Sequence, residues 1–85
     1  MGQKEFETAL AEVKTLANQP PNVLLELYGL YKQASDGDVL GKRPGMLDIK
    51  GRAKYDAWAT RKGMTREAAM DEYVKVVERL KKENG

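Results

Sequence analysis

The chain has 85 residues, of which 41% are hydrophobic and 33% charged, so it can form one small domain and has no room for a second core. It contains no cysteine and no histidine, which excludes disulfides and removes the usual residues of hydrolytic triads and zinc sites. The formal net charge of +2 is too small to indicate a nucleic-acid partner by itself.

The positive charge lies in the later part of the chain. Before residue 30 only Lys4 and Lys14 stand against four glutamates. No apolar run approaches the roughly 20 residues of a membrane-spanning helix, and no signal peptide is visible. We therefore expect a cytoplasmic protein without stable membrane insertion.

A first helix is predicted from about residue 4 to Ala17, because apolar residues recur there at helical spacing. They are Phe6, Ala9, Leu10, Val13 and Leu16. The Pro20-Pro21 pair ends this segment, and Asn22 is a candidate N-cap for a second helix.

The second helix runs to Asp36 and is apolar around more of its circumference than one core contact requires. We therefore expect some of Leu24, Leu25 and Leu27 to face a groove. A loop from about Asp36 to Leu47 follows, because glycine and proline break the pattern. Loops of this length are usually functional or disordered. This one carries Val39, Leu40, Met46 and Leu47, so we expect it to be ordered and packed. Arg43 is expected either to pair with an aspartate or to add to the positive field.

Asp48 is a candidate N-cap for a third helix that reaches about Lys62 and stops at Gly63. We expect Trp58 of this helix to lie in the core. Thr65 is a candidate N-cap for a fourth helix, whose apolar stripe consists of Ala69, Met70, Tyr73, Val74, Val77 and Leu80. Four helices with one long connection predict an all-α four-helix bundle in which the first helix packs on the fourth.

Aromatic and basic residues flank the long loop. Tyr28, Tyr31 and Lys32 are spaced i, i+3 and i+4, so they share one face of the second helix. Lys50 and Lys54 form a second pair on the third helix. Phenol rings beside ammonium groups suit a ligand with an aromatic ring and phosphates, because a ring stacks on a base while a lysine meets phosphate as a point charge. The alternatives are core packing for the tyrosines and a solvated face for the lysines.

Short motifs in this region match a known family. They are YKQA (31–34), GD (37–38), RPGMLD (43–48), KG.AK (50–54) and DAW (56–58). Together they resemble the acyl-coenzyme A-binding protein family, and the resemblance covers nearly the whole chain. It implies an up-down-down-up order of the four helices, with a long ordered loop between the second and third. The chain departs from the family at Tyr55, where tryptophan is common, and its link between the first two helices is one residue shorter.

The resemblance also implies which residues bind the ligand. These are Lys14, Tyr28, Gly29, Leu30, Tyr31, Lys32, Lys50, Lys54 and Tyr73. In the family, the residues that match Tyr28, Tyr31, Lys32 and Lys54 hold the adenine and the ribose 3′-phosphate, and the one that matches Lys14 lies near the pyrophosphate. The implied acyl-chain groove consists of Leu24, Leu25, Ala53 and Tyr55, with Val23 and Met46 as further candidates.

The resemblance implies a monomeric, non-catalytic protein without metal or cofactor. It would bind medium- and long-chain fatty acyl-CoA esters with high affinity and act as an intracellular carrier and pool former. One alternative is a small helical nucleic-acid-binding module that uses the same tyrosines and lysines. It is disfavoured because 13 acidic residues offset the 15 basic ones. A third hypothesis, a domain of an acyl-CoA enzyme, ranks last because nothing in the chain resembles catalytic apparatus.

Overall fold

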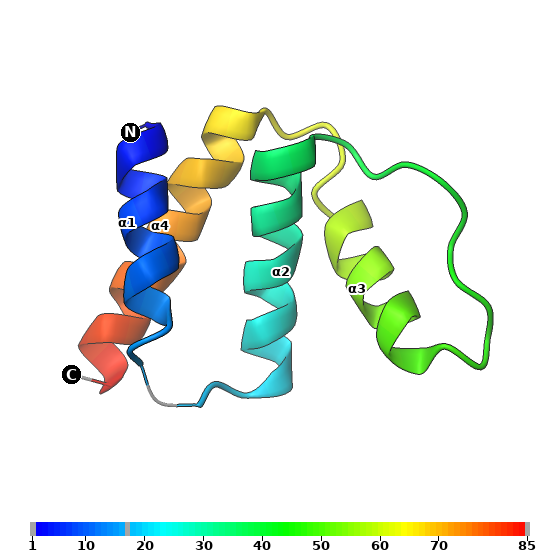
Figure 1. The fold of residues 1–85 in the computed structure, drawn as a ribbon, viewed down its shortest axis with the longest axis horizontal. Coiled ribbons are helices and arrows are strands. Elements are labelled where there is room, and N and C mark those ends of the chain that lie inside the picture. The colour runs from blue at the N-terminus through cyan, green and yellow to red at the C-terminus, as the bar shows by residue number, and fades with distance from the viewer. Residues whose placement is uncertain (1, 17, 85) are drawn as a thin grey trace.

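Four helices make up the described part of the chain, residues 2–16 and 18–84 of a computed structural model. They are α1 (Gln3–Val13), α2 (Pro21–Asp36), α3 (Ile49–Ala59) and α4 (Arg66–Asn84). In Figure 1, α1 and α4 run down the view on the left, whereas α2 in the centre and α3 on the right run up it. The predicted all-α class with four helices is confirmed.

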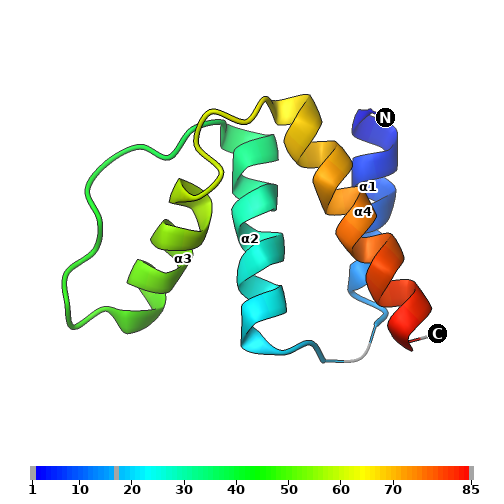
Figure 2. The same ribbon diagram turned by 180° about the vertical axis from the view of Figure 1, so that it is seen from behind.

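The central element is α2. It packs against α4 on one side and against α3 on the other, while α1 packs on α4. Figure 2 shows the same order from behind. The molecule measures 38 × 26 × 15 Å, and its thinnest dimension is little more than the diameter of one helix with its side chains, about 10–12 Å. α2 keeps exposed side chains, among them Leu24 and Tyr31, although other residues of this helix enter the core.

The hydrophobic core is built by α1, α2 and α4. Its buried members are Phe6, Ala9, Leu27, Leu30, Ala34, Ala69, Tyr73, Val74, Val76, Val77 and Leu80. Phe6 meets Tyr73 edge to face with ring centroids 5.3 Å apart, so the predicted packing of the first helix on the fourth is confirmed. In contrast, α3 contributes no fully buried residue.

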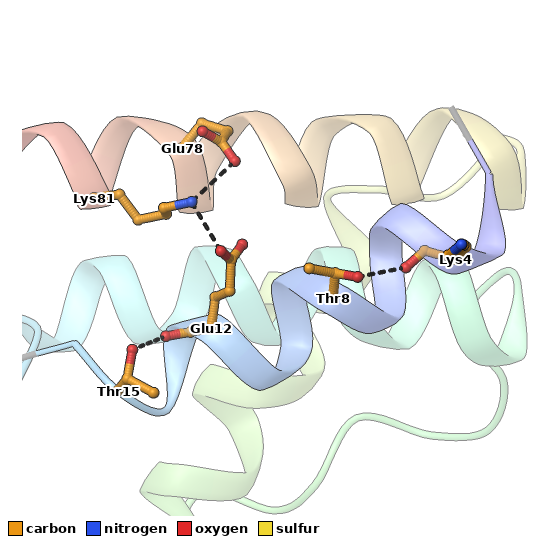
Figure 3. A network of polar contacts seen from close by, with 6 residues as sticks. All are labelled: Lys4, Thr8, Glu12, Thr15, Glu78 and Lys81. Atoms are coloured by element: carbon orange, nitrogen blue, oxygen red, sulfur yellow. Dashed lines mark hydrogen bonds and ion pairs between the residues drawn. The ribbon is translucent and has the colours of Figure 1, made fainter.

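Polar contacts also join α1 to α4 (Figure 3). Lys81 Nζ lies 2.8 Å from Glu12 Oε2 and 3.5 Å from Glu78 Oε1. A further contact in the same view is local: the hydroxyl of Thr15, in the turn after α1, donates to the carbonyl oxygen of Glu12 at 2.7 Å. Exposed ion pairs contribute little net stability, so the apolar contacts provide most of the stability of this helix pair.

The C-terminal end of α1 and the N-terminal end of α2 differ from the prediction. α1 ends at Val13, and a turn follows in which Leu16 N–H donates to the Val13 carbonyl at 3.3 Å. The predicted end, Ala17, lies outside the described residues. Asn22 is not the N-cap of α2: the helix begins at Pro21, one residue earlier. Proline suits the first helical position because its φ is preset and its missing N–H would have had no partner there.

Both predicted caps of the second half are confirmed. The Asp48 carboxylate accepts a hydrogen bond from Gly51 N–H at 3.0 Å, and the Thr65 hydroxyl accepts one from Ala68 N–H at 3.0 Å. However, α3 ends at Ala59, three residues before the predicted end. Turns follow as far as Gly63, whose φ of 92° needs a residue without a side chain.

The long loop between α2 and α3 is not packed through its large apolar residues. Leu40, Met46 and Leu47 are 80%, 82% and 99% exposed, so the expectation that they pack is wrong. Figure 1 shows the reason: the loop runs along the outer side of α3, where no other helix covers it.

Polar contacts to α3 hold this loop instead. Arg43 pairs with Asp56 through two hydrogen bonds of 2.8 and 2.6 Å, which realises the first of the two roles considered for this arginine. The Tyr55 hydroxyl donates to the Gly41 carbonyl at 3.0 Å. The loop and α3 therefore form one unit.

A second group of contacts fixes the start of the loop. The fully buried Gln33 donates its side-chain amide to Asp38 Oδ1 at 2.8 Å and to the Met64 carbonyl at 2.7 Å. Asp38 Oδ1 also accepts from Gly63 N–H at 2.8 Å. Trp58 is only partly buried and lies outside the core, contrary to expectation, because α3 packs against α2 alone among the described helices. Its indole N–H donates to the carbonyl of Gly37 at 2.7 Å.

Acid is expected to release α3 and the loop before the core unfolds. The Gly63 N–H and the Gln33 amide lower the pKa of Asp38, and the Arg43 guanidinium lowers the pKa of Asp56. Groups with a lowered folded pKa stabilise the fold above their unfolded pKa, near 4 for aspartate, and this contribution is lost as pH falls through the folded value. Emission of Trp58, the only tryptophan, should therefore change at a higher pH than the far-UV circular dichroism.

The matched variant is Asp38→Asn with Asp56→Asn, which should show the acid-type Trp58 signal already at neutral pH. A single transition in which emission and helicity fall together in the unmodified protein would contradict this expectation.

Candidate ligand-binding site

An apolar cavity of about 330 Å³ opens between α2 and α3. Its lining consists of Pro21, Leu24, Leu25, Ile49, Lys50, Ala53 and Lys54. Three of the four predicted groove residues, Leu24, Leu25 and Ala53, therefore lie together. Leu24 is 54% exposed, an apolar side chain at the surface of a helix that elsewhere enters the core.

The sequence pattern did not single out two members of this lining, Pro21 and Ile49. Ile49 is 76% exposed in the first turn of α3, directly before Lys50. A large apolar residue at a helix start, next to a lysine of the predicted ligand set, was the available signal.

Three other groove candidates lie elsewhere. Tyr55 does not line the cavity, because its hydroxyl is bound to the loop backbone at Gly41. Val23 packs against the core, and Met46 is exposed on the loop.

Lysines of α3 lie at the edge of the cavity. Lys50 and Lys54 both contribute to its lining, and the Lys54 ammonium lies 5.6 Å from the ring centroid of Tyr28 on α2. Long lysine stems cover apolar surface while the charged end stays in water. Lys54 therefore joins the apolar cavity to the aromatic face of α2.

The two tyrosines of α2 present part of their surface to solvent. Tyr31 is 41% exposed, and its ring lies 6.5 Å from that of Phe6 in a stacked orientation. Tyr28 is partly buried beside Lys54. Neither is a wholly buried core tyrosine, so both rings keep surface on which a planar group can stack.

Among the predicted ligand-binding lysines, Lys32 contacts both a carboxylate and an aromatic ring of the protein. Its ammonium forms an ion pair with Asp36, one turn further along α2, and lies 4.8 Å from the ring centroid of Trp58. The hydrogen bond to Asp36 raises the pKa of Lys32. This lysine is thus held between α2 and α3 with an anion already bound to it.

Lys14 and Tyr73 meet in a second hollow of about 480 Å³ on the other side of α2. It is lined by Val13, Lys14, Leu16, Asn18, Gln19, Leu24, Leu27 and Tyr73. Leu24 belongs to both hollows. Tyr73 is otherwise buried in the core, and this burial raises the pKa of its phenol.

Gly29 and Leu30 lie beneath the site. Leu30 is 1% exposed and belongs to the core. Gly29 is buried against α3 so closely that a β-carbon placed on it would lie 2.4 Å from the carbonyl oxygen of Ala57. This contact sets the distance between α2 and α3, and with it the width of the apolar cavity.

The arrangement favours an amphiphilic anion. Cations and phenol rings from two helices stand beside an apolar cavity. Within residues 2–16 and 18–84, no group of three or more carboxylates is placed to hold a metal ion. In the same ranges, none of the helices combines the length and the apolar character that crossing a membrane requires.

Comparisons with known proteins show the family to which the chain is similar. A sequence profile described as acyl CoA binding protein matches residues 3–77. A protein from a species of Hypsibius is 50% identical over 84 residues, which cover 98% of this chain and 94% of that protein. An acyl-CoA-binding protein homolog from Manduca sexta is 48% identical over 80 residues, or 92% of this chain and 89% of its own.

A solved structure is similarly close. The crystal structure of Oryza sativa acyl-CoA-binding protein 2 superposes with a TM-score of 0.92 at 43% identity, and the match covers 95% of this chain and 91% of that one. The chain therefore belongs to the acyl-CoA-binding protein family.

Proposed function

We propose that this protein binds medium- and long-chain fatty acyl-CoA esters with high affinity and acts as their intracellular carrier and pool former, without catalysis. The observation that carries the proposal is the position of Lys54. Its stem lines the apolar cavity and its ammonium stands over the Tyr28 ring. One residue thus connects a place for an alkyl chain with a place for a nucleotide. Family membership and the names of the relatives support the same ligand class.

In the proposed complex the adenine stacks on Tyr28 and Tyr31, and the ribose 3′-phosphate meets Lys32 and Lys54. That phosphate carries close to two negative charges at neutral pH, so it favours several converging cations. Lys50 adds a further cation from the first turn of α3, where backbone N–H groups also favour anions.

The acyl chain occupies the cavity formed by Leu24, Leu25 and Ala53. Each methylene removed from water contributes about 0.8 kcal/mol, so five buried methylenes would contribute about 4 kcal/mol before the costs of association. Binding would shield the chain from water and hide the thioester. Leu24 continues the apolar surface into the second hollow, where we place Lys14 and Tyr73 near the pyrophosphate and the chain entrance.

Gly29 and Leu30 complete the proposed set of binding residues from beneath. They hold Tyr28 and Tyr31 at the surface of α2. We further propose that the protein acts in the cytoplasm as a monomer, and that it needs no cofactor and no nucleic-acid partner.

Titration calorimetry with palmitoyl-CoA, free CoA and a short DNA duplex tests the function. Palmitoyl-CoA should bind at least about a hundredfold more tightly than free CoA, because four buried methylenes already contribute about 3 kcal/mol. The duplex should bind weakly and lose its binding as salt is added. Equal affinity for CoA and its palmitoyl ester would contradict the groove, and tight binding of the duplex at physiological salt would favour the nucleic-acid alternative.

A further inference from the structure

One cation of the proposed nucleotide site already holds an anion of the protein. The Lys32 ammonium is paired with the Asp36 carboxylate, with side chains 25% and 49% exposed. The Trp58 ring, 4.8 Å away, covers another side of the same ammonium. A ligand phosphate that reaches Lys32 therefore meets a cation whose charge is already matched.

Helix stability does not account for this pair. Asp36 is the last residue of α2, and a carboxylate at a helix C-terminus is disfavoured by the helix dipole. A lysine four residues before an acid is also the weaker order for such a pair on a helix. Partly exposed pairs contribute little net stability, so this one is easily displaced.

We propose that Asp36 is an intramolecular competitor of the ligand, which occupies Lys32 in the free protein and gives way to the ribose phosphate of the acyl-CoA. The proposal rests on the proposed function and assigns a specificity-determining residue within it. A phosphate with nearly two negative charges outcompetes a single carboxylate for one ammonium. A nucleotide without that phosphate gains little from displacing Asp36, so the competition favours the 3′-phosphorylated ligand.

The test is Asp36→Asn, which keeps the side-chain shape and removes the charge. It also leaves the Asp36 carbonyl, which accepts from Arg66 Nη2 at 3.4 Å. Palmitoyl-CoA should bind about two- to fivefold more tightly, the factor that corresponds to an exposed ion pair. The palmitoyl ester of 3′-dephospho-CoA should bind unchanged. With Lys32→Met in the background, Asp36→Asn should no longer improve binding of palmitoyl-CoA.

Glu83→Gln is the matched control, because it removes the same charge near the end of α4 that is remote from the C-terminal end of α2 (Figure 1). The proposal would be overturned if Glu83→Gln raised the affinity for palmitoyl-CoA as much as Asp36→Asn does. It would also be overturned if Asp36→Asn raised the affinity for the dephosphorylated ester, or raised that for palmitoyl-CoA in the Lys32→Met background. Each of these results would mean that Asp36 acts only through its general negative field. No gain from Asp36→Asn in a protein that binds palmitoyl-CoA tightly would overturn it too and leave the function intact. If the unmodified protein does not bind palmitoyl-CoA, the proposed function itself is wrong.

Discussion

Gly29→Ala is expected to detach α3 from α2 and to weaken acyl-CoA binding by about tenfold or more. The added β-carbon would lie 2.4 Å from the Ala57 carbonyl oxygen and 2.8 Å from its carbon. Backbone atoms cannot rotate away as a flexible side chain can, so the two helices must separate. Alanine favours a helix over glycine by about 1 kcal/mol, whereas overpacking costs about 1–3 kcal/mol. The clash therefore outweighs the gain.

The structure indicates which element moves. α2 is fixed to α4 through buried residues, whereas α3 contributes none to the core. The clash is thus relieved by displacement of α3, which also opens the apolar cavity. Hydrogen exchange should show lost protection in residues 49–59 and retained protection in α1 and α4. Gly45→Ala is the matched control, since a β-carbon there has no neighbour within 4 Å and its φ is not positive. Full protection of α3 in Gly29→Ala, with unchanged binding, would contradict this account.

The helices could be predicted from the sequence because their signals are local. Apolar residues predicted α1, α2 and α4, whereas α3, which has no buried residue, was predicted from its cap and stop signals. Asp48 and Thr65 cap α3 and α4 as expected because a cap needs only its own first turn. Asn22 failed as a cap since two prolines precede it, and the sequence did not decide which residue opens the helix. The choice depends on where the chain from α1 arrives.

The loop could not be predicted because its contacts join residues far apart in the chain. Arg43 and Asp56 are 13 residues apart and give no periodic signal. The apolar character of Leu47 indicated burial, yet burial needs a neighbouring element, and none lies beyond α3. The expectation that Trp58 lies in the core was wrong for a related reason: among the described helices α3 packs against α2 alone, and its sequence does not show that it lies outside the core.

For the candidate site, the sequence predicted which residues lie on the same face of a helix, but it did not predict which side chains contact one another. The spacing of Tyr28 and Tyr31 predicted their common face, and Lys54, expected across the loop from them, does lie beside the Tyr28 ring. The ion pair of Lys32 with Asp36 had a readable signal, a spacing of four residues on one helix. Gly29 also had one, since a glycine inside an apolar helix indicates close packing.

Lys54→Met is expected to weaken binding of palmitoyl-CoA and of free CoA by the same factor, about ten- to a hundredfold, because a hydrogen bond to a charged group contributes about 1.5–3 kcal/mol. Methionine keeps an unbranched apolar stem of similar length, so the wall of the cavity remains. Only the ammonium over the Tyr28 ring is lost. The ratio of the two affinities should therefore stay as in the unmodified protein, and calorimetry with both ligands measures it.

Two further variants separate charge from groove. Lys82→Met, on the exposed last turn of α4, removes the same charge and should leave both affinities within about twofold, because exposed charges more than a Debye length away, about 8 Å in physiological salt, are largely screened.

Leu25→Asn tests the groove instead of the charge. It places an amide in the apolar lining, so the affinity for palmitoyl-CoA should fall while the affinity for free CoA stays unchanged. If Lys54→Met lowered only the affinity for palmitoyl-CoA, this lysine would act through the cavity and not on a phosphate. Unchanged binding of both ligands would show that the Lys54 ammonium contributes nothing to nucleotide affinity, which would contradict the role that the proposed function gives to this lysine.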